Sequence, residues 1–249
     1  MISTEFSSRV AVVTGGSDGL GLDFCKKLVE AGCEVFFCAR NAQRGAAAAE
    51  LIGQGAHYFQ VDVAEAEQLR SFADHVRQAL GKVDYLVNNV AVDDRIPFGE
   101  VDEEQADRMW QVNLRSYILT TRLFLDLLRA GEGKSIVNIV TTNYMMGNEA
   151  MTLYNAAKSG IIGFTRSLAR ELGREGIRAN MVTPGWIMTE KQLREYVSEE
   201  DKTALVREQA LKFLLYPEHV TPPVLFFLSS AASAITGQNL VVDGGKVMQ

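Results

Sequence analysis

A β-branched run at 10–14 leads directly into a glycine-rich turn and then a helix-like segment at 19–31. This order of short apolar strand and longer helix recurs along the chain. Strands that are apolar throughout are typical of parallel sheets buried on both faces. Alternating strands and helices form right-handed crossovers on such a sheet. The sequence therefore predicts an α/β fold, a doubly wound parallel sheet with helices on both faces.

The expected strands and helices run through the whole chain of 249 residues without a repeat or linker, so we expect one domain over 1–249. A charged stretch at 189–215 breaks the alternation, and we expect it to form a substrate lid. The expected strands are 10–14, 35–38, 58–61, 86–88, 136–140, 179–182 and 240–242, and the expected helices are 19–31, 41–52, 65–80, 103–128, 153–172 and 223–229.

Charge and composition exclude several classes of protein. The net charge of -6 disfavours binding to nucleic acid and anionic membranes, since both are polyanions, and no apolar run approaches a membrane span. Three cysteines without a paired framework and a polar segment at 1–9 favour a cytoplasmic protein. The three histidines are far apart, so we expect no metal site.

The glycine-rich turn has the features of a phosphate-binding loop. Gly15 permits a sharp turn, Gly19 allows close approach of a pyrophosphate, and Gly21 allows the helix to pack against the strand. The helix then begins with unpaired N–H groups and a partial positive charge. We expect a dinucleotide here, contacted by the residues Gly15, Ser17, Asp18, Gly19, Leu20 and Gly21.

Tyr154 and Lys158 are four residues apart within an expected helix, so their side chains share one face. A free phenol has a pKa near 10 and is a poor proton shuttle at pH 7. A nearby ammonium group stabilises the phenolate and lowers the pKa of the tyrosine. The spacing therefore favours an acid–base centre, although such pairs also occur on ordinary helices.

Several ordered motifs together resemble the short-chain dehydrogenase/reductase family over nearly the whole chain. The glycine loop matches Thr-Gly-x-x-x-Gly-x-Gly, and Tyr154 with Lys158 matches Tyr-x-x-x-Lys. The resemblance implies a single-domain Rossmann fold with a seven-stranded sheet. It also implies further cofactor contacts from the matching positions Asp62, Val63, Asn89, Ala91, Pro184, Gly185, Ile187 and Thr189, and from Tyr154 and Lys158.

The resemblance implies that Tyr154 moves a proton, that Lys158 lowers the pKa of the tyrosine and holds the nicotinamide ribose, and that Asn113 positions a water within a kinked helix. The family usually has a serine thirteen residues before the tyrosine, where this chain has Thr141. Threonine keeps the hydroxyl, so we expect Thr141 to fill the role, with Thr142 as the alternative. Substrate contacts are expected from Thr141, Asn143, Tyr154 and Trp186.

The choice of cofactor depends on the end of the second strand. Family members that use NAD carry an acidic residue there, whereas this chain has Ala39 followed by Arg40, with Arg44 nearby. A guanidinium suits a 2′-phosphate, which favours NADP(H) over NAD(H). Asp18 favours the opposite choice, because many NADP-preferring relatives have a basic residue at that position.

The expected activity is hydride transfer between a nicotinamide and a secondary alcohol or carbonyl. Asp93, Asp94, Arg95 and Gln192 resemble residues of sugar dehydrogenases, which favours a sugar or polyol, whereas Met145 and Met146 favour an apolar ketone or 3-oxoacyl substrate. A dinucleotide-binding sensor or scaffold, and an epimerase or dehydratase, are the alternatives. The resemblance also implies a homotetramer or homodimer packed through 103–128 and 153–172.

Overall fold

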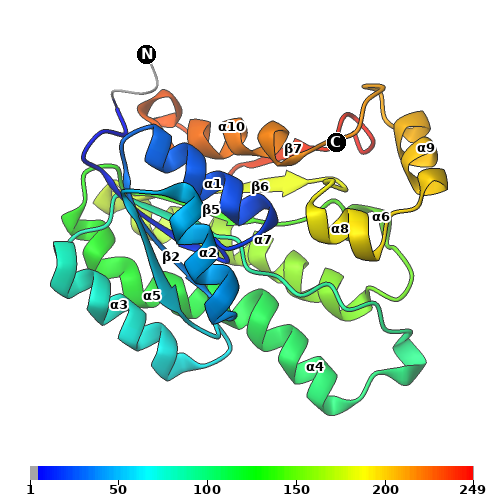
Figure 1. The fold of residues 1–249 in the computed structure, drawn as a ribbon, viewed down its shortest axis with the longest axis horizontal. Coiled ribbons are helices and arrows are strands. Elements are labelled where there is room, and N and C mark those ends of the chain that lie inside the picture. Colours follow the sequence, from blue (N-terminus) through cyan, green and yellow to red (C-terminus); the bar gives the residue numbers. More distant parts are fainter. Residues whose placement is uncertain (1–4, 249) are drawn as a thin grey trace.

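Seven parallel strands form one sheet in the order β3-β2-β1-β4-β5-β6-β7 in the computed structural model, which describes residues 5–248 (Figure 1). The first four residues of the polar segment at 1–9 lie outside the described part. The strands are β1 (Val10–Thr14), β2 (Glu34–Ala39), β3 (Ala56–Gln60), β4 (Tyr85–Asn88), β5 (Ser135–Ile139), β6 (Arg178–Pro184) and β7 (Asn239–Val242). The predicted fold class, a doubly wound parallel sheet, is confirmed.

Helices cover both faces of this sheet (Figure 1). One layer contains α1 (Gly19–Glu30), α2 (Ala42–Ile52) and α10 (Pro217–Leu228), and the other contains α3 (Ala66–Leu80), α5 (Ser116–Ala130) and α7 (Thr152–Leu172). Shorter helices are α4 (Glu103–Trp110), α6 (Asn143–Met146), α8 (Glu190–Glu195) and α9 (Glu199–Glu208).

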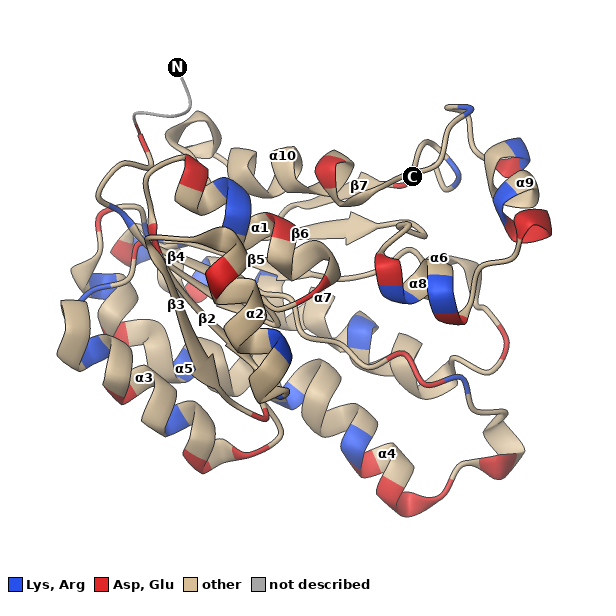
Figure 2. Ribbon diagram, viewed as in Figure 1, with Lys and Arg blue, Asp and Glu red and all other residues tan. Residues whose placement is uncertain are grey.

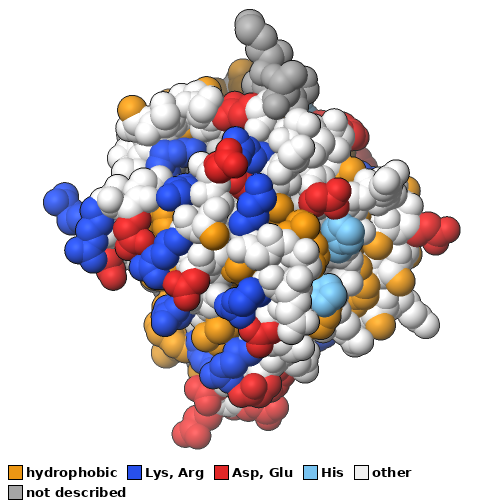
Figure 3. Space-filling model, turned by 90° about the vertical axis from the view of Figure 1, so that its left-hand side faces the viewer, with side chains coloured by type: hydrophobic (Ala, Val, Ile, Leu, Met, Phe, Trp, Pro, Cys, Tyr) orange, Lys and Arg blue, Asp and Glu red, His pale blue; other side chains and the backbone are white. Residues whose placement is uncertain are grey.

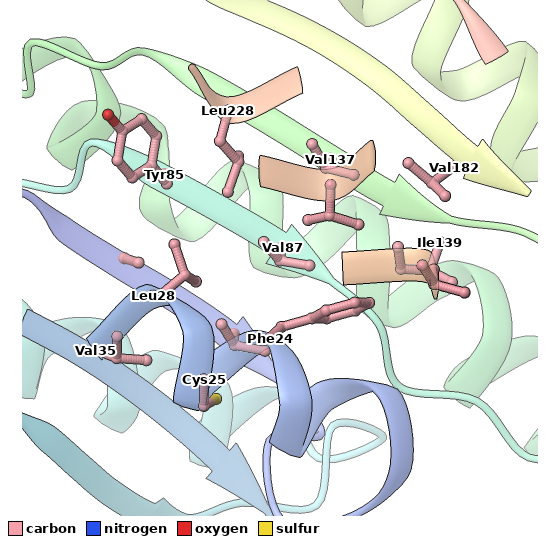
Figure 4. Close-up of a cluster of buried hydrophobic side chains, with 14 of the residues drawn as sticks. Phe24, Cys25, Leu28, Val35, Tyr85, Val87, Val137, Ile139, Val182 and Leu228 are labelled. Carbon is pink, nitrogen blue, oxygen red and sulfur yellow. The ribbon is translucent and has the colours of Figure 1, made fainter. Parts of the chain in front are cut away.

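The core explains why the strands are apolar throughout. Ala11 and Val13 of β1 pack under α1 and α10, whereas Val10 and Val12 pack on the opposite face with α3 and α5. Successive residues of a strand point to opposite faces, so a sheet covered on both sides needs an apolar residue at every position. Figure 4 shows the first of these clusters, in which Phe24 and Leu28 of α1 lie over the sheet.

Several boundaries differ from the predicted ones. The predicted helix 103–128 is interrupted by a π-helical turn, Gln111–Arg115, between α4 and α5. The last long helix begins at Pro217 rather than at 223, with proline at its first turn, where no N–H is needed, and with Pro222 and Pro223 inside it. The third strand begins at Ala56, because the whole of Ala56–Gln60 pairs with β2.

Charged residues lie mainly on the helices and loops, and the strands carry few of them (Figure 2). On the face drawn in Figure 3, acidic and basic side chains are interspersed with scattered hydrophobic ones. Within residues 5–248, no helix has the length and apolarity required to cross a membrane. The same residues contain no cluster of three or more side chains suited to hold a metal ion.

Candidate active site

A cavity of about 780 Å³ lies at the carboxyl edge of the sheet, from the loop after β1 to Tyr154 and Trp186. This volume is in the range of small-molecule and cofactor sites. The structure places nearly every predicted site residue on its wall: Gly15, Ser17, Asp18, Gly19, Leu20, Arg40, Asp62, Val63, Asn89, Ala91, Thr141, Asn143, Tyr154, Lys158, Pro184, Gly185, Trp186, Ile187 and Thr189. Gly21 and Asn113 lie behind this wall.

The glycine loop is held in shape by the backbone. Gly15 has a φ of +73°, which favours glycine, and the N–H groups of Gly15 and Gly16 donate to the carbonyl oxygen of Cys38 at 2.9 and 3.2 Å. The carboxylate of Asp18 caps α1 by accepting from the N–H of Gly19 at 2.7 Å. Gly15 and Gly19 therefore present bare backbone to the cavity, as a pyrophosphate requires.

Gly21 acts by close packing behind the loop. A Cβ at this position would lie 2.0 Å from the carbonyl oxygen of Gly15, and backbone of the same loop is the obstacle. We expect Gly21→Ala to lower the free energy of unfolding by about 1–3 kcal/mol, the usual cost of overpacking, and to weaken dinucleotide binding at least tenfold. Chemical denaturation and fluorescence titration with NADP(H) measure the two effects.

Gly163→Ala is the matched control for this prediction. Gly163 lies within α7, and a Cβ there would meet nothing within 4 Å. Since alanine favours a helix over glycine by about 1 kcal/mol, this control is expected to be neutral or stabilising. Equal losses of stability and binding in the two variants would contradict the account of the loop.

Two predicted cofactor contacts have a clear structural role. The side-chain amide of Asn89 donates to the carbonyl oxygens of Thr14 and Gly15 at 3.1 and 3.3 Å, which ties the end of β4 to the glycine loop. The carboxylate of Asp62 accepts from the N–H of Ala64 at 3.0 Å, which shapes the turn after β3. Both residues still line the cavity.

Basic residues lie at the glycine-loop end of the cavity, beyond the last residue of β2, Ala39. Arg40 and Arg44 line the cavity there. Arg44 lies 3.8 Å from the carboxylate of Asp18, so part of its charge is balanced within the chain. Arg40 has no ion pair among those found in the described residues, and its guanidinium is free to meet an anionic group.

Tyr154 and Lys158 are brought together in the interior, on one face of α7, with exposed fractions of 8% and 1%. The Lys158 amine lies 5.9 Å from the centre of the Tyr154 ring. Burial lowers the pKa of Lys158 to about 7, against a smaller opposing effect of Asp93. Burial raises the pKa of Tyr154, as does the charge of Asp93, whereas a hydrogen bond with Thr141 lowers it. Tyr154 is therefore protonated at pH 7 in the unliganded chain.

Thr141 and Thr142 both follow β5 and line the cavity, but their contacts differ. The Thr141 hydroxyl lowers the pKa of Tyr154 and accepts from the N–H of Asn143 at 3.2 Å. The N–H of Thr142 donates to the carbonyl oxygen of Pro184, which ties this loop to the end of β6. The geometry favours Thr141 over Thr142 as the hydroxyl next to the tyrosine.

Asn113 lies in the π-helical turn and is fully buried. Its side-chain oxygen accepts from the N–H of Val92 at 3.0 Å, and its amide donates to the Val92 carbonyl at 2.9 Å. Asn113 thus clamps the loop after β4, and its own side chain does not face the cavity. Single π-helical turns inside α-helices are frequently found at functional sites.

At the end of the cavity that Trp186 lines, polar contacts join two segments that are distant in the sequence. Lys191 donates to Asp93 at 3.0 Å, and the amide of Gln192 donates to the same carboxylate at 3.1 Å. The indole N–H of Trp186 donates to Gln192 at 2.7 Å. Only the first part of the predicted lid, including Thr189, Lys191 and Gln192, lines the cavity; α9 lies outside it.

Sequence reasoning missed several residues near this site. Lys191 and Tyr196 belong to the lid contacts, where the Arg95 guanidinium lies 4.7 Å from the Tyr196 ring. Tyr117 contacts Lys158 from α5 and follows Asn113 by four residues. That helical spacing is the one signal that was available for Tyr117.

The predicted residue Asn143 is held by its neighbours, since its side-chain amide lies 3.2 Å from the sulfur of Met151.

Comparisons with known proteins agree with this geometry. A family model described as enoyl-(acyl carrier protein) reductase matches residues 15–246. The probable galactose dehydrogenase GalD of Rhizobium meliloti (strain 1021) is 35% identical over 97% of this chain and 96% of that protein. The D-xylose 1-dehydrogenase of Caulobacter vibrioides (strain NA1000 / CB15N) is 34% identical over 98% of each. A crystal structure of a candidate short-chain alcohol dehydrogenase from Sinorhizobium meliloti 1021 superposes with a TM-score of 0.90 at 30% identity, covering 97% of this chain and 98% of that chain.

Proposed function

The chain belongs to the short-chain dehydrogenase/reductase family, and from this premise we propose that it is an NADP(H)-dependent dehydrogenase of a sugar or polyol. Membership makes it an oxidoreductase that acts on CH–OH groups with a nicotinamide cofactor, as predicted. The observation that carries the choice of substrate is the polar group formed by Asp93, Gln192 and Trp186 at the end of the cavity next to Tyr154.

Asp93 and Gln192 suit a ligand with several hydroxyl groups. Each oxygen of Asp93 already accepts one hydrogen bond, from Lys191 or Gln192. The Gln192 oxygen accepts one from Trp186. Each of these oxygens has a second lone pair, so the group can accept further hydrogen bonds from the hydroxyls of a diol. The Trp186 ring offers an apolar surface beside these polar atoms. Asp93 and Tyr154 line the same cavity, so a substrate bound there can contact both. The galactose and xylose dehydrogenases among the relatives support this assignment.

The residues around Tyr154 suit proton transfer at a substrate oxygen. During reduction Tyr154 donates its proton to the substrate carbonyl oxygen and becomes a tyrosinate. During oxidation Tyr154 first loses its proton to solvent, and the tyrosinate then accepts the hydroxyl proton of the substrate, while the Thr141 hydroxyl orients the same oxygen. Lys158, when protonated, stabilises the tyrosinate that forms. Buried surroundings strengthen these interactions because water does not screen them. The nicotinamide, when bound, exchanges hydride with the substrate carbon.

The cavity fits a dinucleotide, and its basic end supports NADP(H) over NAD(H). Gly15 and Gly19 line the cavity without side chains, which leaves their backbone open to a pyrophosphate. Cβ atoms at these positions would lie 2.9 and 3.1 Å from the side chains of Val90 and Thr189. Ala39 brings no carboxylate to the ribose position, and Arg40 lines the cavity without an ion pair among the described residues. A 2′-phosphate would balance this guanidinium.

A substrate screen read by absorbance at 340 nm tests both proposals. We expect oxidation of aldoses or polyols, with kcat/KM for NADP⁺ at least tenfold above that for NAD⁺. We expect Asp93→Asn to raise KM for the sugar about tenfold, since the charged hydrogen bonds to two hydroxyls are weakened. Exposed Asp74→Asn on α3 is the control. Turnover of a 3-oxoacyl thioester with NADPH, without turnover of any aldose, would contradict the proposed substrate class.

A further inference from the structure

Lys158 is held on its buried side by a second phenol. Its amine donates to the hydroxyl of Tyr117 at 3.0 Å and to the carbonyl oxygen of Ile139 at 2.9 Å. The Tyr117 hydroxyl in turn donates to the same Ile139 carbonyl at 3.1 Å. Tyr117 and Lys158 are each 1% exposed. These three contacts join α7, α5 and the end of β5 at one point.

These contacts occupy two of the N–H donors of the Lys158 ammonium and leave the third available. An ammonium has three donors, and Tyr117 and Ile139 take two of them. Lys158 also lines the cavity, so its remaining donor faces the space beside Tyr154. Building on the proposed function, we propose that Tyr117 is a positioning residue, which fixes the Lys158 amine so that its free donor serves the acid–base centre.

Tyr117 is suited to this role because it stays neutral. Burial raises the pKa of Tyr117 well above its ordinary value, so the hydroxyl keeps its proton. The hydroxyl can therefore donate a hydrogen bond to the Ile139 carbonyl while it accepts one from Lys158. The amine lies 4.8 Å from the centre of the Tyr117 ring and 5.9 Å from that of Tyr154. An acceptor and two aromatic faces all favour the charged form of the lysine, against its burial.

The other titratable groups that act on the Lys158 amine are few. Tyr154 faces it from α7, Tyr117 from α5, and Asp93 acts on it from the loop after β4. Removing the Tyr117 hydroxyl therefore leaves Tyr154 and Asp93 in place. Loss of one acceptor makes the lysine release its proton at lower pH, and a neutral lysine stabilises the tyrosinate less.

Tyr117→Phe tests this role in the unliganded protein. Thermal unfolding is measured from pH 5.5 to 9 for the native chain and for Tyr117→Phe, each with and without Lys158→Met. Within each pair, the difference in melting temperature between the chains with Lys158 and with Lys158→Met gives the pH range in which the lysine affects stability. We expect that range to begin at least half a pH unit lower in Tyr117→Phe. An unchanged range would overturn the proposal.

Turnover gives a second measurement. We expect Tyr117→Phe to lower kcat for alcohol oxidation at pH 7 about tenfold, the scale of one hydrogen bond to a charged group, with KM changed less than twofold. The pH midpoint of kcat is expected to move upward. Tyr117→Gln, which returns an acceptor oxygen, is expected to move the midpoint back toward the native value, and a midpoint as high as that of Tyr117→Phe would count against the role.

Tyr85→Phe is the matched control, because Tyr85 is equally buried at 1% exposure but lies on β4. It is expected to change stability without moving either pH midpoint. If both variants lose stability alike and neither pH curve moves, Tyr117 is only a packing residue. If the native chain turns over no aldose or polyol, the proposed function fails, whereas the unfolding curves still decide the role of Tyr117.

Discussion

Replacing Lys158 with methionine is expected to remove a rise of stability with pH between pH 7 and 9, and to lower kcat about 10²-fold. The folded chain releases the Lys158 proton at about pH 7, because burial disfavours the charge. An unfolded lysine keeps its proton to about pH 10.4. Raising the pH between these values therefore stabilises the fold, by up to about 1.4 kcal/mol per pH unit.

The change in kcat follows from the lost charge. A unit charge acting over 5.9 Å, the distance from the amine to the centre of the Tyr154 ring, is worth about 3 kcal/mol at an effective dielectric of 20. That energy corresponds to about two orders of magnitude in the stability of the tyrosinate. Stopped-flow or steady-state absorbance at 340 nm measures the rate, and calorimetry over the pH range measures stability.

Lys27→Met is the control for Lys158. Lys27 is exposed on α1 and pairs with Glu30, so it stays protonated in both the folded and the unfolded chain over pH 7 to 9. Burial raises the pKa of all three cysteines, so they lose protons in this range only in the unfolded chain. That effect is shared by all the variants and cancels in the comparison. The account of the buried amine fails if Lys158→Met and Lys27→Met show the same pH dependence of stability as the native chain.

Replacing Tyr154 with phenylalanine is expected to lower kcat by about 10²–10⁴-fold, the usual contribution of a positioned acid or base. The hydroxyl is the only group removed, and the ring keeps its packing against Met109 and Met151. We therefore expect the fold and the affinity for NADP(H) to change little, as read by calorimetry and fluorescence titration. Tyr144→Phe on α6 is the control, because Tyr144 does not line the cavity.

The parts of the site that could be predicted are those with a local pattern. The glycine loop lies within eight consecutive residues, and Tyr154 and Lys158 lie one helical turn apart. The alternation of apolar strands and helices predicted the buried parallel sheet, because such strands need apolar residues on both faces. These features are encoded by neighbours in the chain and require no knowledge of the tertiary packing.

The remaining parts depend on contacts between distant segments. Tyr117 meets Lys158 across 41 residues, and Asp93 meets Lys191 across 98. The π-helical turn at Gln111–Arg115 has no composition that separates it from the helices on either side. The pKa directions likewise follow from burial, which only the fold determines: the spacing of Tyr154 and Lys158 predicted a lowered tyrosine pKa, whereas in the unliganded chain the pKa is raised.

The central claim is that Tyr154 passes the proton while a nicotinamide exchanges hydride with the substrate. The most direct test compares initial rates at 340 nm for the native chain and Tyr154→Phe, with an aldose and NADP⁺ at saturation. The account predicts steady formation of NADPH by the native chain and a rate at least 10²-fold lower for Tyr154→Phe. Equal rates from the two proteins, with NADP(H) bound equally well, would contradict it.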